Sequence, residues 1–344
     1  MRRLTEDMQT NERGAITVMV AILMVVLLGS AAIAVDVGVI YSERAQLQSG
    51  ADAAAVALAQ KCAGNAADPL CSTTSTLARD LANQNALDGM SKVYNIQLDK
   101  TAQKVSVTTS AKEPGGTDNS VSLFFAGALG VPTKEVGTKA SAEWGSPLKG
   151  PTAFPITVSV CQVRGQTGVM QLLQLHGKLK NPGCNYGPSG APVPGGFGGL
   201  KQDAGSCGAI IDVAKATAGG DTGSNPPPNC EALLNGWGAD ITAGKEVILL
   251  LPVFNAVTGT GAGAVYGLTT FAAFKVAGWK FSGGSTLPYT FRNRAPDVPA
   301  ALECREATQC KGIIGTFVKY VSLASGYTLG PVHADGATIA RLTL

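Results

Sequence analysis

The chain has 344 residues, which is room for two or three compact units at the usual domain size. Only 15% of the residues are Asp, Glu, Lys or Arg, against roughly 25% in an average soluble domain, and 45% are apolar, so a disordered chain is excluded. The 27 basic and 24 acidic residues give a net charge of +3 and form no basic stripe, which excludes nucleic acid as a partner.

The first predicted element is an uncharged apolar run over residues 15–35, AITVMVAILMVVLLGSAAIAV. As a helix it is long enough to cross a bilayer core of about 30 Å. We expect a membrane anchor in the lipid bilayer formed by Ala15, Ile16, Val20, Leu23, Val26, Leu28, Ile33 and Val35. Arg2, Arg3 and Arg13 precede the run, and positive flanks stay in the cytoplasm. Residues 1–14 are therefore expected to be cytoplasmic, and the bulk of the chain extracytoplasmic.

A cleaved signal peptide is the alternative, because Ala32-Ile33-Ala34 forms an A-x-A cleavage site. The apolar run is longer than the usual h-region of about 7–15 residues. A helical pattern also continues beyond it, with apolar residues on one face at Ile40, Leu47, Ala51, Ala54, Ala55 and Leu58. One long helix over residues 15–61 is therefore predicted. With cleavage, the chain would instead be an exported hydrolase or a secreted adhesin or binding module.

The segment RGAITVMVAILMVVLLGSAAIAVDVGVIYSERAQLQSGADAAAVALAQ resembles the amino-terminal segment of TadE/TadG-like proteins of Tad (Flp-type) pilus assembly. The shared marks are Arg13-Gly14, Asp36 with Gly38, Gln46-Leu47-Gln48 and Asp52-Ala53-Ala54-Ala55. The resemblance implies a membrane-anchored accessory or minor pilus component whose partners are other pilin-like or Tad-system proteins. Asp36, Leu47 and Asp52 are the candidates for helix association.

Two family features are absent or weakly matched. Gly14 is not followed by the Glu that type IV-like prepilins carry about five residues after their cleavage site, so an unprocessed, TadG-like form is expected. Some TadG relatives carry a von Willebrand factor A domain, whose metal motif D-x-S-x-S matches residues 118–122. Turn-forming residues precede this match, where that fold needs a strand. We interpret it as the cap of a short helix over residues 121–129.

Residues 62–146 are predicted to form a small α+β unit. A helix over residues 73–89 is followed by strands at 93–98 and 105–109, the helix at 121–129 and a strand at 135–143. A long anchor helix with a small α+β head is similar in architecture to pilin-like subunits.

Residues 147–344 are predicted to form a mostly β, disulfide-containing domain, a sandwich or a barrel-like meander. A proline-rich boundary at 147–155 precedes strands at 154–160, 169–175, 247–253, 266–281 and 313–323, separated by Gly, Pro and Asn clusters. Helices are expected at 207–217 and 230–234. The glycine- and proline-rich segment 182–199 is either an adhesive or ligand-facing loop, or a connection held by Cys184.

Eight cysteines, all after the apolar run, are disulfide candidates: Cys62, Cys71, Cys161, Cys184, Cys207, Cys230, Cys304 and Cys310. Export to an oxidising compartment accounts for this distribution. Local pairs are favoured at 62/71 and 304/310, and sequential pairs at 161/184 and 207/230, although pairing is not fixed by sequence. Without a C-x-x-C pair, neither a zinc ribbon nor a thioredoxin-like site is indicated, and no metal is predicted.

No catalytic constellation stands out. Residues 259–264 fit G-x-G-x-x-A, but a strand-like stretch follows them where a dinucleotide site needs a helix, so they are expected to turn a hairpin. There is no phosphate loop and no G-x-S-x-G elbow. His176 and His333 have no context typical of a catalytic base. We therefore predict a non-enzymatic protein without cofactor or small-molecule substrate.

Overall fold

The computed structural model describes residues 4–116, 118–177, 197–215, 217–219, 227–259, 263–305, 310–322 and 326–343. The chain divides into two compact units, Met1–Glu143 with Leu342–Leu344, and Trp144–Arg341. The prediction placed the boundary at residue 147, in a proline-rich linker. Strand β5 (Gly137–Thr152) instead runs through residues 143 and 144, and Pro147 and Pro151 lie within it.

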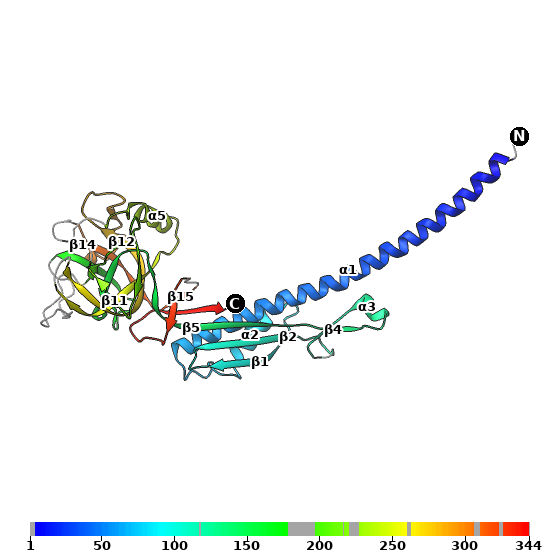
Figure 1. Cartoon of the computed structure of the whole chain (residues 1–344), viewed down its shortest axis with the longest axis horizontal. Coiled ribbons are helices and arrows are strands. Elements are labelled where there is room, and N and C mark those ends of the chain that lie inside the picture. Colours follow the sequence, from blue (N-terminus) through cyan, green and yellow to red (C-terminus); the bar gives the residue numbers. More distant parts are fainter. Residues whose placement is uncertain are drawn as a thin grey trace. The chain divides into compact units, whose positions relative to one another are not determined.

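The first unit begins with the long helix α1 (Leu4–Gly64), which is drawn in blue in Figure 1. The predicted single helix is confirmed, and it starts before the apolar run and continues without a break through Asp36. The second half of α1 packs against α2 and β2 of the first unit. The apolar face predicted from helical spacing is buried from residue 47 onward, including Leu47, Ala51, Ala54, Ala55 and Leu58.

Helix α2 (Thr76–Gln84) lies against α1 through small residues. A Cβ on Gly50 would lie 3.1 Å from Ala82 Cα, and Ala78 and Ala82 are the buried residues of α2. Small side chains let two helix backbones approach closely. The disulfide Cys62–Cys71 closes the turn after α1, with its Cα atoms 4.9 Å apart.

Three antiparallel strands cover α1 in the order β1 (Ser91–Asp99), β2 (Lys104–Ala111) and the first part of β5. The alternating residues Val105 and Val107 are buried, as expected for a sheet with one covered face. The Thr109 hydroxyl donates to the Leu47 carbonyl at 2.9 Å, which ties β2 directly to α1.

The predicted helix over residues 121–129 is wrong at its start. Strand β3 (Ser120–Ser122) pairs with β4 (Thr133–Glu135), and only Phe124–Ala128 between them forms a helix, α3. The cause is tertiary: Val121 is buried against Leu47 of α1, which holds its segment extended.

The second unit contains a sheet of order β7-β14-β12-β11-β6-β8 among the described residues. Its strands are β6 (Ile156–Ser159), β7 (Met170–Gly177), β8 (Phe197–Gly199), β11 (Ile248–Thr258), β12 (Val265–Lys280) and β14 (Cys310–Val318), with the short β10 (Thr217–Ala218) and β13 (Thr290–Phe291) beside β12. The hairpin β11–β12 pairs Thr258 with Val265 across the glycine-rich residues, of which 260–262 lie outside the described residues.

Further strands pack beside this sheet: β9 (Ala209–Asp212), β15 (Tyr320–Ser322), β16 (Thr328–Gly330) and β17 (Thr338–Thr343). The short helices are α4 (Val160–Val163), α5 (Glu231–Thr242) and the 3-10 turn Ala300–Leu302. The helix predicted at 207–217 is wrong, because Ala209–Asp212 pairs with β5 as a strand. The helix predicted at 230–234 is present and longer.

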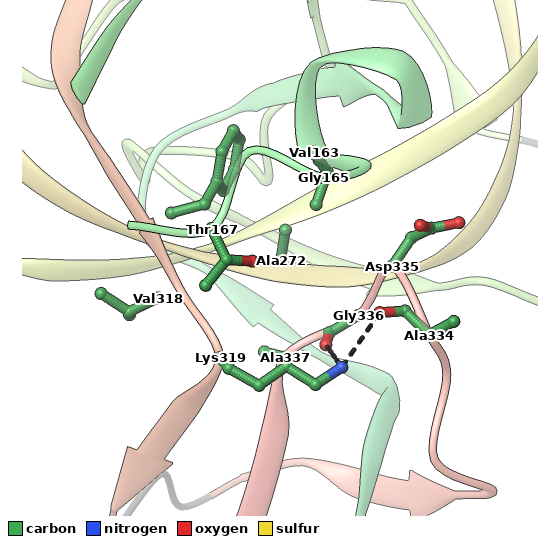
Figure 2. Close-up of a pocket in the computed structure, with 11 residues that line it drawn as sticks. Val163, Gly165, Thr167, Ala272, Val318, Lys319, Ala334, Asp335, Gly336 and Ala337 are labelled. Carbon is green, nitrogen blue, oxygen red and sulfur yellow. Dashed lines mark hydrogen bonds between the residues drawn. The ribbon is translucent and has the colours of Figure 1, made fainter. Parts of the chain in front are cut away.

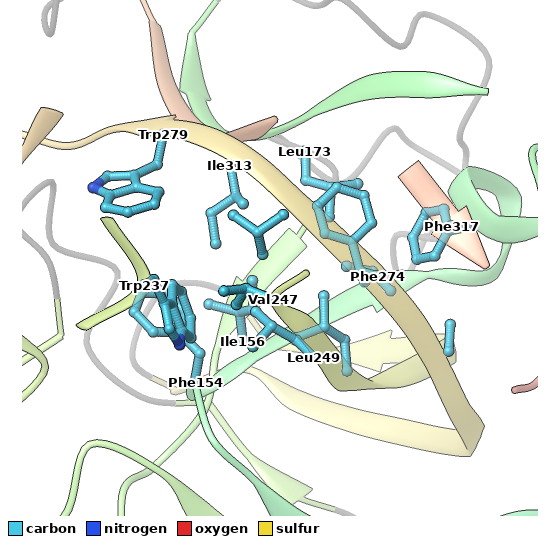
Figure 3. Close-up of a cluster of buried hydrophobic side chains, with 14 of the residues drawn as sticks. Phe154, Ile156, Leu173, Trp237, Val247, Leu249, Phe274, Trp279, Ile313 and Phe317 are labelled. Atoms are coloured by element: carbon cyan, nitrogen blue, oxygen red, sulfur yellow. The ribbon is translucent and has the colours of Figure 1, made fainter. Parts of the chain in front are cut away.

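Both faces of the β11–β12 sheet are buried. Leu249 and Leu251 belong to a buried core with Trp237 of α5 and Trp279. Figure 3 shows Leu249 with the two tryptophans. Leu250 and Phe254, on the opposite face of β11, pack instead with Ile211 of β9 and Ile339 of β17. This arrangement explains why the sequence around ILLLPVF is continuously apolar rather than alternating. The prediction of a strand-rich, disulfide-containing C-terminal region is confirmed.

Candidate functional site

The apolar half of α1 is not buried against any other element in the described part of the chain. Its large aliphatic side chains from Ile16 to Val35 are between 49% and 70% exposed. Apolar side chains all around a helix indicate a nonaqueous environment, because a helix packed on one face would show an apolar stripe. Of the predicted anchor residues, the structure describes the side chains of all except Ala15. This is one helix long and apolar enough to cross a membrane, with a mean hydropathy of 2.8 in its most apolar window.

Asp36, at the outer end of the run, is only 6% exposed. Its carboxylate accepts hydrogen bonds from the backbone N–H groups of Phe124 at 3.1 Å, Phe125 at 3.3 Å and Ala126 at 2.6 Å. These are the first N–H groups of α3, which Figure 1 shows beside α1. The residue preceding α3, Leu123, provides no side-chain cap. Asp36 therefore caps α3 from 88 residues away.

The other two association candidates differ in their surroundings. Leu47 is buried in a cluster with Ala111, Val121 and Val136, so it holds the β3–β4 hairpin on α1. Asp52 is half-buried and accepts from the Gln48 side chain at 2.9 Å within α1. The structure thus brings Asp36 and Leu47 to the same hairpin, and Asp52 is not among its contacts. A role of the three residues in association between chains stays a prediction.

Glu43 lies on α1 between Asp36 and Leu47 and is half-buried. Burial raises the pKa of its carboxyl above the ordinary value, and the charges of Asp88 and Glu113 raise it further. Glu113 itself accepts from the Ser122 backbone at 3.0 Å and thereby holds the β3–β4 hairpin. The ionised form of Glu43 is thus disfavoured in the folded protein.

Replacing Glu43 with glutamine is expected to raise the melting temperature at pH 7 by a few degrees at most. A carboxyl whose pKa is raised by folding destabilises the fold above that pKa, and the effect disappears as the pH falls below the unfolded value of about 4.3. Melting curves of E43Q and the parent between pH 3.5 and 8 should therefore converge at low pH. Glu135→Gln, at an exposed position in β4, is the control. An equal difference between E43Q and the parent at every pH would contradict the electrostatic cause.

Disulfides hold both units. Cys62–Cys71 lies in the first unit, and Cys207–Cys230 and Cys304–Cys310 lie in the second, with Cα atoms 4.7 and 5.3 Å apart. These are the pairs that spacing and sequential order favour. Cys161 is also disulfide-bonded. Residues 178–196, which include Cys184 and most of the segment 182–199, lie outside the described residues. The last three residues of that segment form β8, which pairs with β6.

A pocket of the second unit is lined in part by Lys319 and by residues 334–337, which follow His333, and Figure 2 shows this lining. The Lys319 ammonium donates to the carbonyls of His333, Ala334 and Gly336 at 2.8–3.1 Å. Burial lowers the pKa of Lys319, against the opposing charge of Asp335.

The other polar groups of the loop 333–336 also form hydrogen bonds or ion pairs within the protein. Asp335 is paired with Arg164 at 2.9 Å, and its own backbone N–H donates to His333 Nδ1 at 3.2 Å. The charged and ring groups of this pocket thus fix the 333–336 loop. The side chain of His176 lies outside the described residues.

The D-x-S-x-S match has no converging ligands. Asp118 pairs with Lys92 at 2.7 Å, and the Ser122 hydroxyl donates to Glu113 at 2.6 Å. Asn119 Oδ1 accepts from the Ser110 hydroxyl at 2.7 Å. Within the part of the chain that the structure describes, no three His, Cys, Asp or Glu residues are grouped as metal ligands.

The fold defines a chain with one long apolar helix that fits a membrane anchor, followed by a capped hairpin and a strand-rich, disulfide-linked unit. Residues 14–61 match the family model of TadE/G-like proteins of Flp pilus assembly. This match confirms the resemblance seen in the sequence, and it covers the apolar run, Asp36, Leu47 and Asp52. Comparison with curated proteins gave no match, and comparison with solved structures gave none either.

Proposed function

We propose that this protein is a membrane-anchored accessory or minor component of Tad/Flp-type pilus assembly, acting by anchoring and protein association rather than by catalysis. The observation that carries the proposal is the TadE/G-like match over residues 14–61, which are the residues that form the apolar half of α1 and its packed continuation. The family match supports the pilus-assembly role, and the exposed apolar side chains of α1 support the anchoring.

The proposed topology places residues 1–14 in the cytoplasm and the rest outside the membrane. Arg2, Arg3 and Arg13 precede the run, and positively charged flanks resist translocation. Disulfides in both units support the same orientation, because such bonds persist in oxidising compartments and are rare in the cytosol.

Association with neighbouring subunits would use the part of α1 that the chain itself leaves uncovered. The run carries Gly29 among exposed aliphatic residues, and no other segment of the described chain packs against it. Small residues on a membrane helix allow close helix–helix packing. Asp36 and Leu47 would act by holding the hairpin on α1, and Asp52 remains a candidate for direct helix association.

The test uses the native full-length chain in cell membranes. We expect an intact amino terminus, resistance to alkaline extraction, and capture of pilin or Tad secretion proteins after crosslinking. A soluble chain that begins at Val35 would refute the anchor and favour an exported hydrolase or a secreted binding module. A full-length membrane protein that captures no pilus-system protein would refute the pilus role alone.

A further inference from the structure

We propose that residues 123–132, the tip of the β3–β4 hairpin, insert into the outer headgroup–acyl boundary of the bilayer as a second membrane contact. The inference rests on the proposed function, because it requires α1 to span the bilayer. The ligand is a phospholipid surface. Three independent observations on this tip support it.

The first observation is its composition and exposure. No Asp, Glu, Lys or Arg occurs between Asp118 and Lys134. Phe124 is 82% and Leu129 is 84% exposed, and Phe125 and Val131 are also exposed. Bulky aromatic and aliphatic side chains gathered on one short loop are characteristic of segments that lie in the membrane interface.

The second observation is the position along α1 at which the tip is held. The Asp36 carboxylate binds the first three N–H groups of α3, and Asp36 directly follows the uncharged run. The exposed residues Val35 and Val37 on α1 flank this point. The apolar surface of the tip therefore lies beside the outer end of the apolar surface of the helix.

The third observation is that the tip satisfies its backbone N–H groups without water. Beyond the three bonds to Asp36, the N–H of Leu123 donates to Pro132 O at 2.8 Å and that of Val131 donates to Ala126 O at 2.9 Å. The N–H groups of residues 127, 129 and 130 also donate within the tip. Internal pairing of this kind is required where water is scarce, since an unsatisfied group in hydrocarbon costs several kcal/mol.

These features together favour lipid over a protein partner. A protein surface can supply hydrogen bonds to a loop, so a protein partner does not require a loop whose N–H groups are already paired. The carboxylate of Asp36 is likewise paired with three donors, which lets a charged group lie at the hydrocarbon boundary. The chain thus brings an apolar segment with paired N–H groups to the end of the apolar run of α1.

The test places tryptophan on the tip of the full-length protein, reconstituted in phosphatidylcholine–phosphatidylglycerol vesicles. Phe124→Trp and, separately, Leu129→Trp need no repacking because both sites are exposed. The matched control is Leu87→Trp, which is 88% exposed and whose backbone N–H donates to Gln46, about 15 Å further along α1 than Asp36 at 1.5 Å per residue. The native Trp144, Trp237 and Trp279 are buried, so their emission can be subtracted.

We expect blue-shifted emission at positions 124 and 129, quenched several-fold more strongly by lipids brominated in the acyl chains than the emission at position 87. Vesicle flotation reports the anchor separately. If the protein floats with the vesicles but both tip tryptophans emit as the control tryptophan does, the inference is overturned and the membrane anchor is retained. A blue shift without bromolipid quenching would also overturn it, because protein would then cover the tip. Protein that fails to float would refute the anchor itself.

Discussion

Replacing Asp36 with leucine is expected to release α3 from α1 while leaving the apolar helix intact. The substitution removes the acceptor of three backbone hydrogen bonds and leaves the first N–H groups of α3 unpaired. Hydrogen bonds to a charged group contribute about 1.5–3 kcal/mol, and a partly buried donor left without a partner costs about 1–3 kcal/mol. We expect the hairpin tip to lose about 2–3 kcal/mol of local stability. Hydrogen exchange at residues 124–126, followed by mass spectrometry, measures this loss.

Two control variants isolate the capping role. Asp52→Leu removes a carboxylate that accepts only from the neighbouring Gln48 side chain among its described contacts, so exchange at residues 124–126 should match the parent. Asp36→Asn retains one oxygen acceptor and should give intermediate protection. Unchanged protection in D36L would show that packing of Val121 against Leu47, rather than the cap, positions α3.

The Asp36 cap also shows where sequence reasoning stops. The apolar run and the helix through residue 61 are local patterns, so periodicity and length were enough to predict them. The contact of Asp36 joins residues 88 positions apart, and nothing in either segment alone indicates it. A side chain that caps a distant helix leaves no fixed spacing, in contrast to a capping box within one helix. One local feature does point to such a contact, namely the apolar Leu123 at the N-cap position of α3. A helix whose own N-cap residue cannot accept hydrogen bonds needs an acceptor from another segment for its first N–H groups.

The two wrong helix predictions have the same physical cause. Residues 121–122 and 209–212 were given helical form by their local composition, but each pairs with a strand outside its own segment. Strand β3 pairs with β4 in a hairpin, and β9 pairs with residues 149–152 of β5. In β9, Ala209 and Ile211 are buried while Ile210 is exposed, which is the period of two that a strand requires. A four-residue stretch is too short for this period to be distinguished from a helical one. The partner strand determines that the segment is extended, and the sequence of the segment alone does not identify that partner.

The disulfide pairs were easier to predict from the sequence, because closing a short loop costs less entropy than closing a long one. Cys62 and Cys71 are 9 residues apart and Cys304 and Cys310 are 6 residues apart, so spacing alone favoured them. Cys207 and Cys230 are 23 residues apart and were paired only by sequential order, and the structure confirms this pair with Cα atoms 4.7 Å apart. Such a bridge restricts the unfolded chain and adds about 2–4 kcal/mol of stability.

Replacing Trp279 with alanine is expected to destabilise the strand-rich unit by about 3–5 kcal/mol, the usual cost of removing a buried aromatic ring. Trp279 is 0% exposed, its ring centroid lies 4.9 Å from that of Phe291, and its Nε1 donates to Pro288 O at 2.8 Å. Chemical denaturation followed by near-ultraviolet circular dichroism measures the loss. Tyr320→Ala, at an exposed site of β15, controls for removal of an aromatic ring as such. A midpoint within error of the parent would contradict the assigned core role.

The same variant separates anchoring from association. In the proposed function α1 holds the protein in the membrane and contacts neighbouring subunits, and the strand-rich unit is a second candidate surface for partners outside the membrane. Trp279→Ala should therefore remain in the membrane fraction, because residues 16–35 are untouched, but should lose the crosslinks that depend on a folded second unit. Trp279→Phe keeps most of the ring packing and gives up only the bond to Pro288, so it should retain both properties. Undiminished partner capture by an unfolded W279A variant would show that the second unit is not needed for association and that α1, with its uncovered apolar side chains, is sufficient.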